Sequence, residues 1–333
     1  MTERTGKIEM KSSSKMFILI EAVLAAAAAV LAALMLLGKT GENFDKISVI
    51  VQNSDDNQWA AFKYGLKMAA EDHEVEMFVA GTEGEMTVEE QERVIEQEID
   101  NGADAVIVQP VPGEDTEAML KRVENSVPVM LAGSTASLDK EASALPVTEP
   151  DNYAMGKALA EELLEDYAGN LNGKTIGILT ETDESEAAVN RRQGFCDVLQ
   201  ETGGRILWDV AGSFGSEEQR SLEELPGADL VAALDDMSLA SAGQCAASNH
   251  LHGAVVYGIG NSTEAVYYLD TGNVECLVVP DEFNVGYQSL TEMAAGLQHH
   301  FREVRSRTAD FTVIRREELF SEENQELLFT MSQ

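Results

Sequence analysis

Short apolar runs alternate with amphipathic segments along most of the chain. Many runs are rich in Val and Ile and end at Gly or at a polar loop, a pattern typical of buried strands. In the segments between them, apolar residues recur at helical spacing. The pattern predicts strands at residues 47–51, 75–80, 105–109, 127–132, 174–179, 205–210, 230–234, 254–259 and 275–279. Strands that alternate with helices in this way predict βαβ units and parallel sheets.

Local signals place the starts of two helices. Thr87 and Glu90 have the spacing of a capping box, which predicts a helix over residues 87–101. Asp115 is a natural N-cap for a second helix, over residues 116–125.

The pattern restarts in the middle of the chain. The strand at 174–179, its acidic loop and the helix that ends near Thr202 repeat the arrangement that begins at Lys46. Gly65 follows Lys46 by 19 residues, and Gly194 follows Lys174 by 20. This predicts two doubly wound α/β lobes in tandem, each with a ligand crevice at the carboxyl ends of its strands. If the lobes face each other, the two crevices form one cleft.

One longer apolar run predicts a membrane anchor. Met16–Leu37 spans 22 residues with a single charge, Glu21. A helix of that length reaches about 33 Å, enough for a hydrocarbon core of about 30 Å. The run is too long for a signal-peptide core and no Ala-x-Ala site follows it, although a buried core helix or a cleaved signal remain alternatives. Four basic residues before it predict a cytoplasmic N-terminus and an extracytoplasmic remainder.

Charge and motif content narrow the function. The chain has 23 Lys and Arg against 59 Asp and Glu, a net charge of −36, which disfavours nucleic acid as a partner. Its three cysteines are too few and too far apart for a disulfide framework or a zinc site, and they are expected to be small buried residues. Neither Gly-x-Ser-x-Gly nor His-Glu-x-x-His occurs, and no dinucleotide fingerprint is complete. We therefore predict a protein that is not an enzyme and that carries no cofactor or metal.

An ordered set of segments resembles a known family. Residues 47–65, 101–110, 127–131 and 149–152, then Arg191 to Phe195 and Asp235-Asp236, are similar in order and spacing to ribose-binding-type (type I) periplasmic solute-binding proteins. The resemblance covers about residues 45–320. It implies two α/β lobes, a small ligand trapped by closure, and three hinge crossings, near 148–152, 279–283 and 309–312.

The resemblance also implies domain boundaries. After a basic tail (1–15), the anchor (16–37) and a linker (38–45), the first lobe comprises residues 46–149 and about 281–309. The second lobe comprises 150–280 and about 310–325, and residues 326–333 form a tail.

The family's ligand contacts carry over to individual positions. From the first lobe these are Gln52, Asp56, Trp59 and Gln109, and from the second Arg191, Phe214 and Asp235. A flat ring, carboxylate acceptors and a forked guanidinium suit a neutral, hydroxyl-rich ligand the size of a monosaccharide. Each position also has a structural alternative: Trp59 can pack into the core, Arg191 can form a surface salt bridge, and Asp235 can cap a helix.

Three positions depart from the family's sugar binders. Gly133-Ser134 stands where they carry Asp-Arg, Gly260 where they carry Asp, and Pro280-Asp281 where they carry Gln. A polar partner lost without replacement costs about 1–3 kcal/mol. An altered polyol, a nucleoside-like ligand or a signalling molecule therefore remains open beside a pentose or hexose.

Two functions fit these expectations. The first is the solute-binding component of an ABC importer, acting with a membrane permease. The second is a ligand-sensing ectodomain that presents its bound state to a membrane sensor kinase. In both, the partner inside the cleft is a sugar or sugar-like small molecule.

Overall fold

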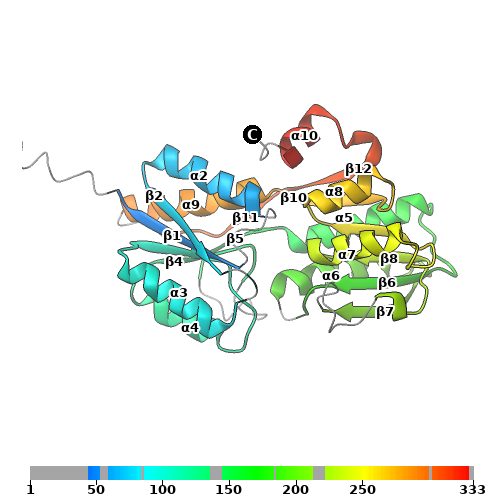
Figure 1. Ribbon diagram of the computed structural model, residues 1–333, viewed down its shortest axis with the longest axis horizontal. Helices are drawn as coiled ribbons and strands as arrows, with labels where there is room; N and C mark the ends of the chain where they lie inside the picture. Colours follow the sequence, from blue (N-terminus) through cyan, green and yellow to red (C-terminus); the bar gives the residue numbers. More distant parts are fainter. Residues whose placement is uncertain are drawn as a thin grey trace, which may run out of the picture. The chain divides into compact units, whose positions relative to one another are not determined.

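The fold is built on two six-stranded sheets. The computed structural model describes residues 44–52, 59–82, 84, 86–135, 145–183, 185–212, 222–299 and 302–329. In this part of the chain the sheets have the strand orders β11-β5-β4-β3-β1-β2 and β12-β10-β9-β8-β6-β7 (Figure 1). Each sheet has its own helices, and we call the two assemblies lobe 1 and lobe 2.

Lobe 1 contains a parallel sheet. Its first strand pairs with its neighbours in the registers Lys46 to Glu76 and Ile47 to Ala105. Its strands are β1 (Lys46–Val51), β2 (Glu76–Gly81), β3 (Ala105–Val108), β4 (Val129–Ala132), β5 (Val147–Pro150) and β11 (Arg307–Ala309). Its helices are α2 (Ala60–His73), α3 (Val88–Asp100), α4 (Thr116–Glu124) and α9 (Glu282–Gln298).

Lobe 2 repeats this plan with one antiparallel strand. β12 runs antiparallel to β10, and all other pairs in this sheet are parallel. Its strands are β6 (Thr175–Thr180), β7 (Arg205–Ala211), β8 (Leu230–Ala233), β9 (Val255–Ile259), β10 (Cys276–Pro280) and β12 (Phe311–Arg315). Its helices are α5 (Asn152–Asp166), α6 (Glu186–Leu199), α7 (Asp236–Ala247), α8 (Thr263–Asp270) and α10 (Glu322–Phe329), with short 3-10 turns at Leu222–Glu224 and Arg316–Glu318.

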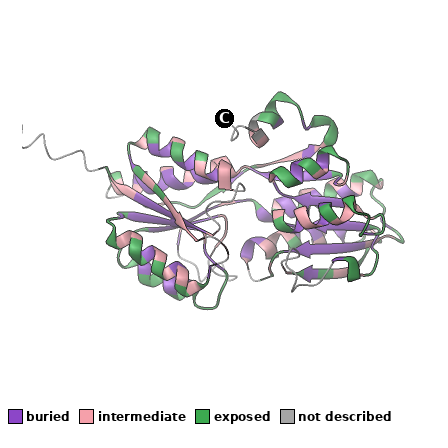
Figure 2. Ribbon diagram, in the orientation of Figure 1, coloured by how far each residue is buried: buried purple, intermediate pink, exposed green. Residues whose placement is uncertain are grey.

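Helices cover both faces of each sheet. In β1, Ile47, Val49 and Val51 pack with α2 and α9, whereas Ile50 packs with α3 and α4. Lobe 2 has the same layers, with α5 and α6 on one face and α7 and α8 on the other. Side chains on successive strand residues point to opposite faces, so a strand covered on both faces reads as a continuous apolar run. The central strands of the two sheets are accordingly the most buried elements: β1, β3 and β4 in lobe 1, and β6, β8, β9 and β10 in lobe 2 (Figure 2).

The chain crosses between the sheets three times. β5 leads into α5 at residues 150–152, β10 leads into α9 at 280–282, and β11 leads into β12 at 309–311. Backbone hydrogen bonds join these segments, because Asp151 N–H donates to Ala309 O and Asp281 N–H donates to Asp310 O.

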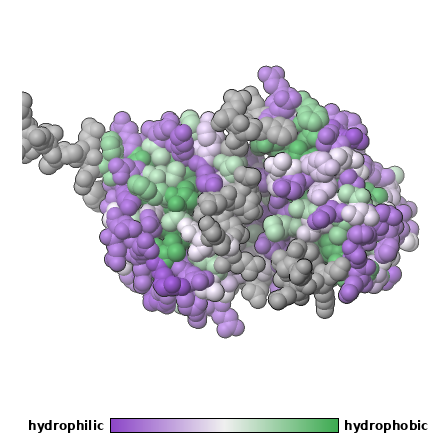
Figure 3. All heavy atoms as spheres, viewed as in Figure 1, coloured by the Kyte–Doolittle hydropathy of each residue, from purple (hydrophilic) through white to green (hydrophobic). Residues whose placement is uncertain are grey.

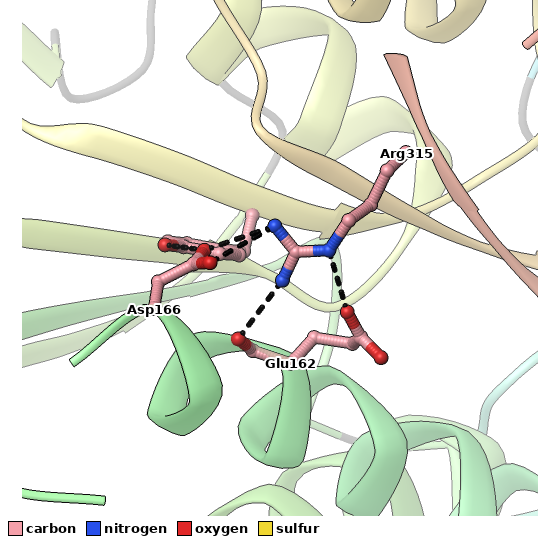
Figure 4. A network of polar contacts seen from close by, with 4 residues as sticks. Glu162, Asp166 and Arg315 are labelled. Atoms are coloured by element: carbon pink, nitrogen blue, oxygen red, sulfur yellow. Dashed lines mark hydrogen bonds and ion pairs between the residues drawn. The ribbon is translucent and has the colours of Figure 1, made fainter. Parts of the chain in front are cut away.

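Ion pairs hold the third crossing on both sides. In lobe 1, Arg307 of β11 and Arg302 bind Glu292 of α9, whose side chain is 3% exposed. Burial raises the pKa of Glu292, but these two arginines outweigh that effect and leave the pKa below its ordinary value. In lobe 2, Arg315 of β12 binds Glu162 and Asp166 of α5 at 2.8 and 3.0 Å (Figure 4).

The internal repeat reappears as two close helix pairs. A Cβ added at Gly65 of α2 would lie 2.0 Å from Phe283 O, at the start of α9. A Cβ added at Gly194 of α6 would lie 2.1 Å from Tyr153 O, at the start of α5. Only glycine fits a backbone approach this close, which explains the matching glycine positions noted in the sequence.

The structure agrees with most of the predicted elements and corrects some. All nine predicted strands are present, and the capping box of Thr87 and Glu90 is confirmed. Three strands were not predicted: β5, β11 and β12. Asp115 precedes α4 as expected but makes no capping hydrogen bond with its side chain. Cys276 is buried, whereas Cys196 and Cys245 are half-buried.

The acidic composition appears at the surface. The face seen in Figure 3 is largely hydrophilic, with scattered apolar side chains. Among the helices of the described residues, none is long and apolar enough to cross a membrane. The anchor predicted at residues 16–37 lies outside the described residues.

Candidate functional site

A cavity of about 560 Å³ lies at the carboxyl ends of the strands and takes residues from both lobes. The loops after β1, β3 and β4 line it from lobe 1, and the loops after β6, β8, β9 and β10 line it from lobe 2. This is the position at which parallel α/β sheets bind ligands. A smaller cavity of about 340 Å³, near Arg192 and Asp209, is lined by lobe 2 alone.

Two glutamine amides line the cavity from lobe 1. Gln109 Oε1 accepts a hydrogen bond from Gln52 N–H at 3.2 Å, and Gln52 Oε1 accepts one from Met86 N–H at 3.2 Å. The backbone carbonyl of Gln109 is held by the buried Gln91 side chain at 2.8 Å. Because the amide oxygens bind backbone groups, the amide nitrogens are the groups that these residues can offer to a ligand.

Trp59 lies between the cavity and the core of lobe 1. It lines the cavity, and it also packs against the lobe 1 core, with its ring centroid 5.6 Å from that of Phe62 in an edge-to-face pair. Its indole Nε1 is shielded from solvent and has no hydrogen-bond acceptor among the described residues. The side chain can therefore present ring surface to a ligand, but it offers no accessible donor in this conformation.

Arg191 reaches the cavity from α6. Its Nε donates to Asn152 Oδ1 at 2.8 Å and its Nη1 donates to Leu234 O at 3.1 Å. These bonds tie α6 to the start of α5 and the end of β8, instead of forming the surface salt bridge considered as an alternative. Burial lowers the pKa of Arg191, and the carboxylates of Asp235 and Glu282 oppose that shift. The guanidinium stays charged, since its ordinary pKa is above 12.

Asp235 lines the cavity and also caps a helix. Its carboxylate accepts hydrogen bonds from Ser238 N–H at 2.8 Å, as the N-cap of α7, and from Glu181 N–H at 2.7 Å. The side chain therefore fixes the loop after β6 and the start of α7. The helix-cap interpretation is right, and it does not exclude a ligand contact.

Asp236 occupies the space left by Gly260. Its Oδ1 accepts hydrogen bonds from Asn261 N–H at 2.8 Å and Ser262 N–H at 2.9 Å. A Cβ at Gly260 would lie 2.3 Å from that same oxygen. Burial raises the pKa of Asp236 although these hydrogen bonds oppose the shift. A carboxylate from the first residue of α7 thus stands where the resemblance implies an Asp after the ninth strand.

Glu282 lies in the cavity just after β10. Asp281 caps α9 through Asn284 N–H at 3.0 Å, and Glu282 is the first residue of that helix. Burial raises the pKa of Glu282 to about 7, although the nearby positive charge of Arg191 lowers it. No hydrogen bond or ion pair to its carboxylate occurs within the described residues. Glu282 therefore supplies a polar group near the position at which the family carries Gln.

The structure brings five of the seven predicted site residues into one cavity: Gln52, Trp59, Gln109, Arg191 and Asp235. Asp56 and Phe214 lie outside the described residues. The sequence interpretation missed Ser134, Asp236 and Glu282, which also line the cavity. The signal for Asp236 and Glu282 was an acid placed at the carboxyl end of a strand.

The fold and this cavity define a class of binding protein. The chain belongs to the family described as "Periplasmic binding protein domain", whose sequence model matches residues 47–300. Members of this family bind solutes and are not enzymes, in agreement with the prediction.

Comparisons with individual proteins agree with this assignment. The galactofuranose-binding protein YtfQ of Escherichia coli is 22% identical over 178 residues, which are 52% of this chain and 54% of YtfQ. The chain thus matches about half the length of that relative. A carbohydrate transporter solute-binding protein from Agrobacterium radiobacter, solved with D-arabinose, is 19% identical with a TM-score of 0.74, covering 86% of this chain and 100% of that one. A chain of the XylFII–LytSN complex is 14% identical with a TM-score of 0.68, covering 82% and 98%.

Proposed function

We propose that this protein binds a sugar or sugar-like small molecule in the cavity between its lobes, as the solute-binding component of an ABC importer. The observation that carries the proposal is a cavity to which both lobes contribute polar side chains at their strand ends. Its volume of about 560 Å³ falls in the range of small-molecule sites. Family membership supports the binding function, and the names of YtfQ and of the D-arabinose complex favour a carbohydrate.

The proposed binding set is Gln52, Asp56, Trp59, Gln109, Arg191, Phe214 and Asp235, with Ser134, Asp236 and Glu282 added from the structure. Amide nitrogens, carboxylates and a guanidinium provide hydrogen bonds in several directions, and Trp59 provides an apolar surface. Such a mixture suits a ligand with hydroxyl groups on a compact ring.

Ligand binding is proposed to close the lobes about the three crossings. The hinge would let lobe 1 rotate relative to lobe 2. Lobe 1 comprises residues 46–149 and about 281–309, and lobe 2 comprises residues 150–280 and about 310–325. Short crossings that link two rigid lobes are the usual setting for hinge closure around a ligand.

The apolar run of residues 16–37 is proposed to anchor the protein in the cell membrane by a single span, with the binding lobes outside the cytoplasm. Its length, its single charge and the basic residues before it support this assignment. Mass spectrometry of the mature protein tests it: an intact N-terminus is expected, whereas an N-terminus between Ala25 and Asn43 would contradict the anchor.

A sensing role is the second candidate. The fold also occurs in the XylFII–LytSN complex, and Gly133-Ser134 departs from the family's sugar binders. In this alternative the bound state is read by a membrane sensor kinase instead of a permease. Affinity capture of the anchored protein from its own membranes separates the two, since an importer would recover a permease and a sensor would recover a kinase.

A thermal-shift screen tests the binding function. The full-length protein is heated with pentoses, hexoses, polyols and nucleosides, one at a time. A ligand present at 100 times its Kd stabilises the folded state by about 2.7 kcal/mol, which gives a clear rise in melting temperature. The proposal fails if no compound in these classes shifts the transition at high concentration.

Two neighbouring arginines provide a matched control for any hit. Arg191→Ala should remove the ligand-dependent shift, because Arg191 lines the cavity. Arg192→Ala should keep it, because Arg192 lies outside that cavity and pairs with Asp209 at the surface.

A further inference from the structure

Acidic groups outnumber basic groups among the described residues that line the cavity. Four carboxylates line it, those of Glu181, Asp235, Asp236 and Glu282. Arg191 is the sole lysine or arginine among the described lining residues. If all five groups are ionised, the described residues that line the cavity carry an excess of negative charge.

The carboxylates differ in how many hydrogen bonds they accept from the protein. Asp235 and Asp236 each accept two backbone N–H hydrogen bonds, at distances between 2.7 and 2.9 Å. Glu282 has no hydrogen bond or ion pair within the described part of the chain. It is therefore the carboxylate whose acceptor capacity remains open for a ligand.

Arg191 does not neutralise Glu282 by direct contact. Two of its three guanidinium nitrogens donate to Asn152 and to Leu234 O. The distance limit for an ion pair is about 4 Å, and no such pair joins Arg191 to Glu282 among the described contacts. The protein orients the guanidinium of Arg191 through these two hydrogen bonds. The carboxylate of Glu282 has no direct partner among the described residues, so a group of the ligand can bind it.

We propose that the ligand of this site carries a protonated amine that binds Glu282, with Asp236 close by, so that the substrate class is an amino sugar or an amino polyol. This inference rests on the proposed binding function and narrows it. It replaces the neutral ligand expected from the sequence, which did not reveal Asp236 and Glu282 as cavity residues.

The chemistry of the two lobes fits such a ligand. Gln52 and Gln109 offer neutral amide nitrogens from lobe 1, suited to hydroxyl oxygens. Lobe 2 offers the carboxylates, suited to an ammonium group. The Glu282 side chain is half-buried, and a carboxylate that loses water without gaining a partner is costly. Its partial burial raises the pKa of Glu282 to about 7. An ammonium ion beside it would favour the charged form and give a charge-assisted hydrogen bond, roughly twice as strong as a neutral one.

Matched pairs of small molecules test the proposal. Titration calorimetry on the full-length protein compares D-glucosamine with D-glucose and D-galactosamine with D-galactose, near neutral pH. The N-acetyl derivatives are included because they keep the nitrogen but lose its charge. At least one amine is expected to bind about tenfold or more tightly than both its parent sugar and its N-acetyl form.

Two glutamine variants assign the effect to one residue. Glu282→Gln should abolish the preference for the amine over its parent sugar. Glu264→Gln is the control: Glu264 is also an acid in the first turn of a helix, α8, but it is exposed and does not line the cavity. This variant should keep the preference. A melting curve for each variant reports whether it is folded.

The outcomes separate this inference from the function on which it rests. Binding of a neutral sugar as tight as that of its amine overturns the inference and leaves the binding function in place. Absence of binding by every sugar, amine and acetylated probe overturns both. The comparison of amine with neutral sugar in the parent protein tests the inference directly. The inference can therefore be overturned even if the Glu282→Gln variant fails to fold.

Discussion

The polar residues on the lobe 2 side of the cavity hold their own loops in place while they face the ligand space. Asp235 shows this most clearly, since one carboxylate caps α7 and also binds Glu181 N–H after β6. Substitution at such a residue is expected to change both the stability of the fold and the affinity for a ligand. A binding assay without a stability measurement would confuse the two.

Asp235→Ala should lower the free energy of unfolding by about 1–3 kcal/mol, because it removes an N-cap and a second backbone hydrogen bond. It should also weaken ligand binding. Thr87→Ala is the control, since Thr87 caps α3 and does not line the cavity. That variant should lose about 1 kcal/mol of stability and keep its affinity. Urea unfolding and calorimetry measure the two quantities, and equal loss of affinity in both variants would remove Asp235 from the site.

Glu282 should make stability depend on pH in an unusual direction. Its pKa is raised by burial to about 7, whereas a glutamate in an unfolded chain titrates near about 4.3. The folded protein holds this proton more tightly, so the stability that Glu282 contributes is present below the unfolded pKa and is lost as pH rises toward about 7.

Glu282→Gln mimics the protonated side chain. The variant is therefore expected to be more stable than the parent at pH 7 and above, with the advantage shrinking as the pH falls to about 4. Urea unfolding of both proteins across this range measures it. A difference that stays constant with pH would show that Glu282 has an ordinary pKa.

At the scale of elements, two helix pairs use glycine to approach closely: α2 with α9, and α5 with α6. The second pair also positions the site. Arg191 O lies 1.9 Å from the place that a Cβ on Gly156 would occupy, so the backbone that carries Arg191 rests directly on α5. The packing of these helices and the place of the guanidinium in the cavity are therefore linked.

Gly194→Ala tests this packing. The added methyl group would lie 2.1 Å from Tyr153 O, a backbone atom that moves only if the helices separate. We expect a loss of about 1–3 kcal/mol in the free energy of unfolding, despite the better helix propensity of alanine. At Gly227 the nearest atom would be 3.4 Å away, so Gly227→Ala should stay within about 0.5 kcal/mol of the parent. Equal denaturation midpoints for both variants would contradict the account.

The sequence predicted the strands that read as apolar runs, among them the central strands that are buried on both faces. It missed β5, whose residues include Thr148, Glu149 and Pro150, and β11, which has three residues and one apolar side chain. Both are short strands next to a crossing. Their pairing depends on partners distant in sequence, since β11 pairs with β5, and no local pattern encodes that contact.

The site was predicted in part for a related reason. Gln52, Gln109 and Asp235 stand at strand ends, which the hydrophobic pattern locates. The replacement of an expected acid at Gly260 by Asp236 depends on a contact between the start of α7 and the loop after β9. In the sequence, Gly260 then lacks the expected carboxylate, and Asp236 is an acid with no assigned role. Only the folded chain shows that the two belong together.

At the scale of the whole molecule, the three crossings decide whether the lobes can move. The third crossing is held on one side by Arg307, which is bound to α9 of lobe 1. On the other side it is held by Arg315, which is bound to α5 of lobe 2 (Figure 4). Rotation is therefore expected at the few residues between those anchors, around Ala309 and Asp310, and at the equivalent points of the other two crossings.

The central claim is that a ligand bound in the cavity draws the lobes together. The most direct measurement is the distance between spin labels at Glu96→Cys on α3 and Gln193→Cys on α6, both exposed positions, in the full-length protein. The native Cys196, Cys245 and Cys276 are replaced by alanine, and calorimetry checks that this background still binds. A saturating ligand from the screen should shorten the distance and narrow its distribution. An unchanged distribution at saturation would contradict closure around the ligand.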